Sequence, residues 1–330
     1  MNGEYYMVIR KGDAWVLYGE QCPTVFTRDQ VEKEYLNLLQ SFGPENVKAL
    51  KLVQLKVEVK ATLQEEEPVS DADKDALAQG QRDYELQEEK AKTGNLRLDD
   101  LVYNGIPFGK QVLVIGPPFI GKETMINSFL LEAMSKDLPV IILTTDCPPT
   151  EIIDELKFIY PNVKEYSKKG LLHFIDAYSK SMGLEPGTNL NSKSVDQPSD
   201  YKAIGAAITE LTEKFKKDGH PVWRMVVRSV SSMIVLTDPV ASYKFLQSLT
   251  GKAKREKAII MYLLDRGMHN EQEVQTLSHL MDGSIEFKTD GVKTFLSVQG
   301  ICDVQSRMWI QYQFSRRGII IGSFALDHIR

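Results

Sequence analysis

A glycine-rich turn between an apolar run and a helical pattern constrains this chain more than any other feature. Residues 112–115 form a continuous apolar run, which is typical of a strand buried in a parallel sheet. The run is followed by Gly116-Pro117-Pro118-Phe119-Ile120-Gly121-Lys122, which matches G-x-x-x-x-G-K, and then by a helix predicted over residues 124–134. Backbone N–H groups of such a turn converge on phosphate oxygens, and the helix N-terminus adds partial positive charge. Residues 116–124 therefore predict a phosphate-binding loop, in which Lys122 reaches the β- and γ-phosphates of a nucleotide.

The rest of the C-terminal two-thirds alternates short apolar runs with helical stretches. Strands are predicted at 140–143, 171–175, 224–227 and 258–264, and helices at 149–159 and 200–217. Continuous apolar strands separated by helices indicate an α/β fold with a mostly parallel, twisted sheet covered by helices on both faces. The alternating pattern of residues 294–329 predicts antiparallel strands at one edge.

The N-terminal part has a different character. Residues 1–63 predict a small α+β module with a ββαβ order, whose elements are expected at 5–9, 14–18, 27–42 and 50–59. Residues 64–92 contain ten acidic and four basic side chains, which predicts an acidic linker or an exposed helix that adds little to either core. The expected domains are therefore 1–63, the connection 64–92, and a nucleotide-binding domain over 93–330.

Charge and composition exclude several classes of function. A net charge of -5, from 40 basic and 45 acidic residues, argues against a strongly basic nucleic-acid-binding face. No apolar run is long enough for a membrane span and the first residues lack a signal-peptide pattern, so we expect a cytoplasmic protein without membrane contact. The three cysteines and five histidines show no metal-ligand spacing, so no metal site is predicted.

Further segments carry the pattern of one family. They are Thr93-Gly94, Leu98-Asp99-Asp100-Leu101, Asn104-Gly105-Ile106-Pro107-Phe108-Gly109, Phe174-Ile175-Asp176-Ala177-Tyr178, Arg228-Ser229-Val230-Ser231-Ser232 and residues 277–286. Together with the loop they resemble the KaiC-like branch of the RecA superfamily, common among archaeal P-loop ATPases. The resemblance covers about residues 93–330. It implies a RecA-like fold, ATP or another nucleotide as ligand, and a homo-oligomer, because members place the nucleotide at subunit interfaces.

Three positions depart from the family's catalytic pattern. The resemblance implies that Glu123 replaces the threonine that holds Mg²⁺, and Thr124 lies one residue later, turned by roughly 100° on the helix. Arg228 replaces the aspartate at the end of the third core strand, which makes the Walker B motif degenerate. Asp146-Cys147 keeps one carboxylate of the acidic pair that activates water. Phosphoryl transfer depends on metal positioning and charge neutralisation, so a pseudo-ATPase without a dependable Mg²⁺ site is expected.

These positions lead to two sharper hypotheses. Asp146 acts as a general base beyond a strand end, or it caps the helix that follows Pro148-Pro149, and the sequence leaves both open. Glu123 and Arg228 are predicted to form a compensating ion pair within about 4 Å in the place of the metal.

We expect a nucleotide-binding regulatory protein with weak or lost hydrolysis, which meets a regulatory partner through residues 1–92. Three alternatives remain open at this point. The first is a working Mg²⁺-dependent ATPase that uses Asp146. The second is a scaffold that binds no nucleotide and acts through its N-terminal module. The third is an accessory protein of DNA recombination, for which the chain lacks an evident basic, glycine-rich loop.

Overall fold

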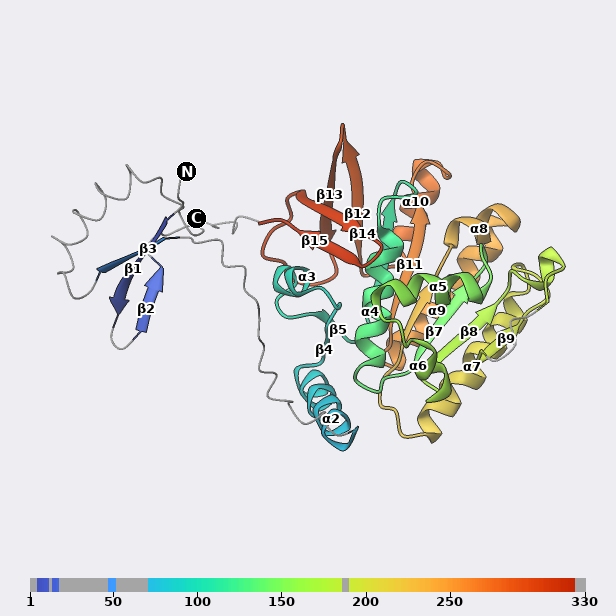
Figure 1. Cartoon of the computed structure of the whole chain (residues 1–330). Coiled ribbons are helices and arrows are strands. Elements are labelled where there is room, and N and C mark those ends of the chain that lie inside the picture. Colours follow the sequence, from blue (N-terminus) through green and yellow to red (C-terminus); the bar gives the residue numbers. More distant parts are fainter. Residues whose placement is uncertain (1–4, 12–13, 18–46, 52–70, 186–189, 324–330) are drawn as a thin grey trace. The chain divides into compact units, whose positions relative to one another are not determined.

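The computed structural model describes residues 5–11, 14–17, 47–51, 71–185 and 190–323 (Figure 1). The chain forms two compact units, residues 1–70 and 71–330. The second unit therefore begins inside the segment that the sequence predicts to be a linker or an exposed helix. None of the helices in the described ranges is both long and apolar enough to cross a bilayer.

The first unit contains a three-stranded antiparallel sheet in the order β2-β1-β3. Its strands are β1 (Tyr5–Lys11), β2 (Ala14–Leu17) and β3 (Val47–Lys51). β1 and β2 pair with Lys11 opposite Ala14, which confirms the hairpin predicted around Gly12. The third strand begins at Val47, earlier than predicted. The helix predicted at 27–42 lies outside the described residues.

The second unit is built on a ten-stranded sheet in the order β15-β14-β13-β12-β6-β11-β10-β7-β8-β9. From β12 to β9 neighbouring strands are parallel, whereas β13, β14 and β15 add an antiparallel edge. The strands are β6 (Gln111–Gly116), β7 (Val140–Thr144), β8 (Leu172–Asp176), β9 (Ser192–Ser194), β10 (Arg224–Val227), β11 (Ile259–Asp265), β12 (Gly283–Asp290), β13 (Lys293–Gln299), β14 (Ile310–Ser315) and β15 (Gly318–Ile321). The predicted mostly parallel sheet with an antiparallel edge is confirmed.

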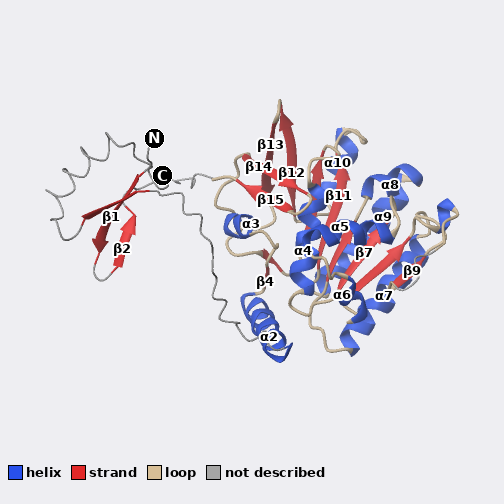
Figure 2. Ribbon diagram, in the orientation of Figure 1, coloured by secondary structure: helices blue, strands red, loops and turns tan. Residues whose placement is uncertain are grey.

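Helices cover this sheet on both faces (Figure 2). They are α4 (Lys122–Met134), α5 (Pro149–Ile159), α6 (Lys164–Lys168), α7 (Tyr201–Lys217), α8 (Val230–Leu236), α9 (Pro239–Arg255) and α10 (Glu271–Ser278). Because side chains alternate along a strand, Val112 and Val114 of β6 pack in the apolar cluster that contains α4 and α5. Leu113 and Ile115 of the same strand pack in the cluster of α7, α8, α9 and α10. Burial on both faces explains why these strands are continuous apolar runs.

The unit also contains the 18-residue helix α2 (Asp71–Glu88) and several short elements. These are α3 (Leu96–Leu101), a two-stranded ribbon of β4 (Lys90–Ala91) and β5 (Ile106–Pro107), and a 3₁₀ turn η2 (Lys180–Met182). α2 confirms a helix in the acidic segment. Glu85 is nevertheless buried, with 2% of its surface exposed, so the expectation that this segment adds little to a core is wrong at that residue.

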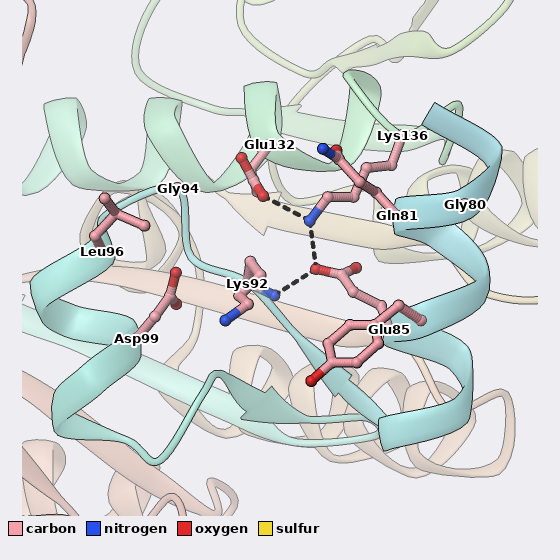
Figure 3. Close-up of a pocket in the computed structure, with 10 residues that line it drawn as sticks. Gly80, Gln81, Glu85, Lys92, Gly94, Leu96, Asp99, Glu132 and Lys136 are labelled. Carbon is pink, nitrogen blue, oxygen red and sulfur yellow. Dashed lines mark hydrogen bonds and ion pairs between the residues drawn. The ribbon is translucent and has the colours of Figure 1, made fainter. Parts of the chain in front are cut away.

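Glu85 attaches α2 to the rest of the unit through ion pairs with two buried cations, Lys136 and Arg224. Figure 3 shows the pair with Lys136. The Glu85 carboxylate lies 2.7 Å from Lys136 Nζ at the end of α4 and 3.1 Å from a guanidinium nitrogen of Arg224 on β10. Arg224 also donates to the carbonyls of Lys92 and Phe129. A buried charge is tolerated only when it is paired and hydrogen-bonded, so each of these groups depends on the others.

We expect Glu85→Gln to lower the free energy of unfolding of the second unit by about 3–5 kcal/mol, because it removes the carboxylate that pairs with the buried Arg224 and leaves Lys136 with Glu132 alone. Chemical denaturation followed by circular dichroism measures this change. Glu88→Gln, on an exposed part of the same helix, is the matched control and should change stability by about 0.5 kcal/mol or less. Equal effects of the two substitutions would show that the Glu85 contacts add nothing.

Candidate functional site

The glycine-rich turn has the strand–loop–helix form that the sequence predicts. β6 ends at Gly116 and α4 begins at Lys122, with Gly121 as the N-cap residue. Gly121 has φ 90°, and a Cβ at this position would lie 2.7 Å from the ring of Phe314. Glycine is therefore required here both by the left-handed backbone and by the close approach of a neighbouring side chain.

The loop offers unengaged backbone donors. Among the turn and loop hydrogen bonds of the described residues, none has a backbone N–H group of residues 119–121 as its donor, and Gly121 provides no side-chain cap. Pro117 and Pro118 have no N–H to contribute. The first N–H groups of a helix lack intrahelical partners, and together with the helix dipole they favour an anion. The remaining donors of the loop are thus available to an anionic ligand.

Lys122 lies inside the loop and is fully buried. Its ammonium group donates to the carbonyl oxygens of Gly116, at 3.0 Å, and Pro117, at 2.5 Å. It also forms an ion pair of 2.8 Å with Asp265, at the end of the adjacent strand β11. The lysine is therefore neutralised by its own protein in this state, and a phosphate that binds in the loop competes with a carboxylate.

The antiparallel edge of the sheet braces the loop from the other side. The hydroxyl of Tyr312 donates to the carbonyl of Ile120 at 2.6 Å, and Thr124 Oγ1 donates to the carbonyl of Ser315 at 3.3 Å. Phe314 packs against Gly121. These contacts fix the loop before any ligand arrives, which reduces the ordering entropy that binding must overcome.

Parallel pairing brings the residues that end four strands to one edge of the sheet. Gly116 of β6 lies opposite Asp265 of β11, and Val227 of β10 lies opposite Leu143 of β7. Arg228, which follows β10 directly, is therefore close to the loop. Sites in open α/β sheets lie at this carboxyl edge, so the structure brings the sequence-predicted loop and Arg228 together where ligands bind.

Arg228 pairs with a glutamate that the sequence did not single out. Its two terminal nitrogens donate to the two carboxylate oxygens of Glu155 on α5, at 2.8 and 2.7 Å. Burial disfavours the charged form of Arg228, yet its pKa is raised from the usual value because Glu155 hydrogen-bonds the guanidinium and Asp146 adds attraction. The predicted pair of Glu123 with Arg228 is wrong. Glu123 lines the same cavity, but α5 presents a carboxylate in bidentate geometry, which a guanidinium prefers.

Asp146 and Cys147 occupy the turn after β7. Thr144 Oγ1 lies 3.4 Å from Asp146 and donates to the carbonyl of Cys147. Pro148 is the N-cap residue of α5 and no side chain caps this helix, so the helix-cap hypothesis for Asp146 is wrong. Desolvation by the surrounding protein raises the pKa of Asp146, and the positive charge of Arg228 opposes this shift. The residue is nevertheless exposed to solvent. Burial raises the pKa of the Cys147 thiol to about 12, so it is not a reactive thiolate.

A cavity of about 530 Å³ adjoins the loop. Its lining combines aromatic faces with charged groups, namely Phe119, Glu123, Thr124, Asn127, Glu151, Asp154, Glu155, Phe158, Arg228 and Arg316. The guanidinium of Arg316 lies 4.9 Å from the ring centre of Phe158, and Phe119 is almost fully exposed at the tip of the loop. Flat apolar faces beside a phosphate-binding loop suit the nucleoside part of a nucleotide. No sequence pattern pointed to Glu155 or Asp265, since each resembles an ordinary charged residue at the surface of its element.

A second cavity, of about 650 Å³, lies between α2 and α4 at the opposite end of β10 (Figure 3). It is lined by Glu85, Lys136 and Glu132, and these groups are already paired with one another. No glycine-rich loop opens onto it. We therefore assign its charges to the attachment of α2 and locate the ligand site at the loop.

Comparison with known proteins identifies the family of this chain. Residues 91–311 match the family model described as "ATPase: KaiC". A UPF0273 protein of Aeropyrum pernix is 27% identical over 161 residues, which are 49% of this chain and 62% of that protein. A UPF0273 protein of Sulfurisphaera tokodaii is 30% identical over 154 residues, 46% of this chain and 51% of that protein. The chain thus spans about half to three-fifths of the length of these relatives.

A solved structure is similar in fold. The KaiC-like protein PH0186 of Pyrococcus horikoshii superimposes with a TM-score of 0.57 at 14% identity, covering 71% of this chain and 99% of that chain. This likeness supports a RecA-like arrangement of the sheet and its helices.

We expect Asp265→Asn to weaken the fold and to strengthen phosphate binding. The substitution removes the counter-ion of a fully buried lysine, which lowers the free energy of unfolding by about 2 kcal/mol. It also removes the carboxylate that competes with phosphate for Lys122, so the affinity for ATP should rise about tenfold. Denaturation and calorimetric titration measure the two effects, with Asp290→Asn at an exposed strand end as the control. Weaker ATP binding by a folded Asp265→Asn protein would contradict the competition.

Proposed function

Because this chain belongs to the KaiC ATPase family, as its motifs predict, we propose that it is a nucleotide-binding regulatory protein that binds ATP and hydrolyses it weakly or not at all. One observation carries this proposal. The phosphate loop keeps its free N–H donors and its lysine, while the carboxyl end of β10 holds an arginine paired with Glu155.

Binding and hydrolysis depend on different parts of the site. Phosphate binding needs the backbone donors, the helix N-terminus and Lys122, and all three are present. Hydrolysis also needs a positioned metal ion and a base that orients water. Glu123 brings no hydroxyl to the metal position that the family resemblance implies, and Arg228 brings a positive charge that repels a divalent cation.

A working ATPase that uses Asp146 is the second candidate, and one observation favours it. The raised pKa of Asp146 moves this carboxyl toward the range in which a general base is most effective. If Asp146 is the base, Asp146→Asn abolishes turnover without abolishing ATP binding.

Self-association and a regulatory partner at residues 1–92 also belong to the proposal. Sedimentation velocity with and without ATP tests the first, because a nucleotide held between subunits would shift the oligomer distribution.

We expect the protein to bind ATP while turning it over far more slowly than a typical enzymatic rate of about 10 per second. Lys122→Ala should weaken ATP binding about tenfold to a hundredfold, because a charge-assisted contact to phosphate is lost. Calorimetric titration measures binding and phosphate release measures turnover. Glu88→Gln serves as the control, because Glu88 lies on α2 and is remote from the loop in sequence.

Two outcomes would contradict this proposal. Rapid Mg²⁺-dependent turnover that disappears in Lys122→Ala would establish a working ATPase. Absence of ATP binding by the folded wild-type protein would leave the scaffold alternative.

A further inference from the structure

Arg228 is a buried cation in the wall of the cavity beside the phosphate loop. It lines this cavity together with Phe119 of the loop and Glu123 and Thr124 of the first turn of α4. Only 6% of its surface is exposed, and the neighbouring Ser229 carbonyl accepts a bond from Thr145, which ties the end of β10 to the end of β7. The guanidinium is therefore held in place at the edge of the ligand site.

Only some of the hydrogen-bond donors of the Arg228 guanidinium have partners. Glu155 accepts from both terminal nitrogens, whereas Arg228 Nε is buried and has no partner among the described residues. The two members of the ion pair also differ in exposure, since 7% of the Arg228 side chain is exposed against 32% of the Glu155 side chain. Glu155 also accepts a hydrogen bond from Asn127 Nδ2 at 3.2 Å, and it is the member of the ion pair that lies nearer to solvent.

The residues around Arg228 do not fit a magnesium ion. Mg²⁺ at a nucleotide is held by one or two protein oxygen ligands together with the phosphates, and the residue that follows β10 is Arg228, which supplies no oxygen ligand. Glu123, Glu151, Asp154 and Glu155 lie around the same cavity, but Glu155 is already engaged by Arg228. A metal ion next to the guanidinium would also meet like charge.

A guanidinium supplies the charge that a metal otherwise supplies. It presents several N–H donors in a planar fork that matches the oxygens of a phosphate, and it remains charged at all physiological pH values. The pairing with Glu155 shows that the terminal nitrogens of Arg228 already donate to an oxyanion in bidentate geometry.

We propose that Arg228 binds a phosphate group of the nucleotide in place of Mg²⁺, exchanging the carboxylate of Glu155 for phosphate oxygens. This inference rests on the proposed function. It makes nucleotide binding independent of divalent metal, and it makes Glu155 an internal competitor that sets the affinity. No bond is broken or formed in the exchange, because one oxyanion replaces another at the same donors.

The first test compares ATP binding by the wild-type protein in Mg²⁺ and in EDTA. Calorimetric titration should give dissociation constants that agree within about threefold, because the protein supplies the cation. Binding that requires Mg²⁺ would overturn the inference and leave the proposed function standing. Absence of binding in both buffers would remove the proposed function, and this inference with it.

The second test alters the pair itself, again with ATP in EDTA. Arg228→Gln should weaken binding about tenfold to a hundredfold, since a charged donor to phosphate is lost, and Arg228→Lys should recover part of it. Glu155→Gln should strengthen binding about tenfold by removing the competitor. Glu151→Gln is the matched control, because it removes one charge from the same cavity wall without touching Arg228.

The variants have decisive outcomes even if one of them folds poorly. Equal affinities of folded Arg228→Gln and wild type in EDTA would overturn the inference, as would equal effects of Glu155→Gln and Glu151→Gln. If Arg228→Gln does not fold, the two single variants Arg228→Lys and Glu155→Gln still show whether the pair controls ATP affinity. The wild-type titration in EDTA tests the inference without any variant.

Discussion

The parallel alignment of β6, β11, β10 and β7 is the constraint on which the rest of the site depends. Backbone pairing sets Gly116 opposite Asp265 and Val227 opposite Leu143, so the residues that end these strands share one edge. A parallel sheet needs helices on both faces, and the helix after β6 brings its free N–H groups to the same edge. A phosphate-binding loop, a buried lysine and a buried arginine thus meet in one place as a consequence of topology.

Ion pairs between buried side chains then determine the positions of the surrounding helices and strands. Lys122 pairs with Asp265, Arg228 with Glu155, and the arginine that begins β10 with Glu85 on α2. Buried ion pairs add little net stability, yet loss of one partner is strongly destabilising, so such pairs specify an arrangement more than they strengthen it. The short strand β10 begins with Arg224 and is followed directly by Arg228. Each of these arginines pairs with a glutamate from a different helix.

In the proposed function, the same pairing separates nucleotide binding from hydrolysis. The groups that hold phosphate are backbone donors and a lysine, which tolerate changes elsewhere in the site. The groups that would cleave it need a metal ion and an activated water, and the residue after β10 is a cation. Cys147 contributes no nucleophile, because burial raises the pKa of its thiol to about 12. The proposed function, nucleotide binding with weak or lost hydrolysis, rests on this difference.

The sequence by itself determined the local features. The strand, the loop at 116–122 and the helix after it follow from apolar periodicity and glycine placement, and β10 was predicted with its observed bounds. Only the tertiary structure decided the partners of the buried charges. Glu155 and Asp265 lie far from Arg228 and Lys122 in sequence, and a lone carboxylate on a helix or at a strand end predicts nothing about what it faces. The predicted partner Glu123 was wrong for this reason: adjacency to the loop places a residue near the site, but ion-pair geometry is set by how α5 and β10 pack, which no local pattern encodes.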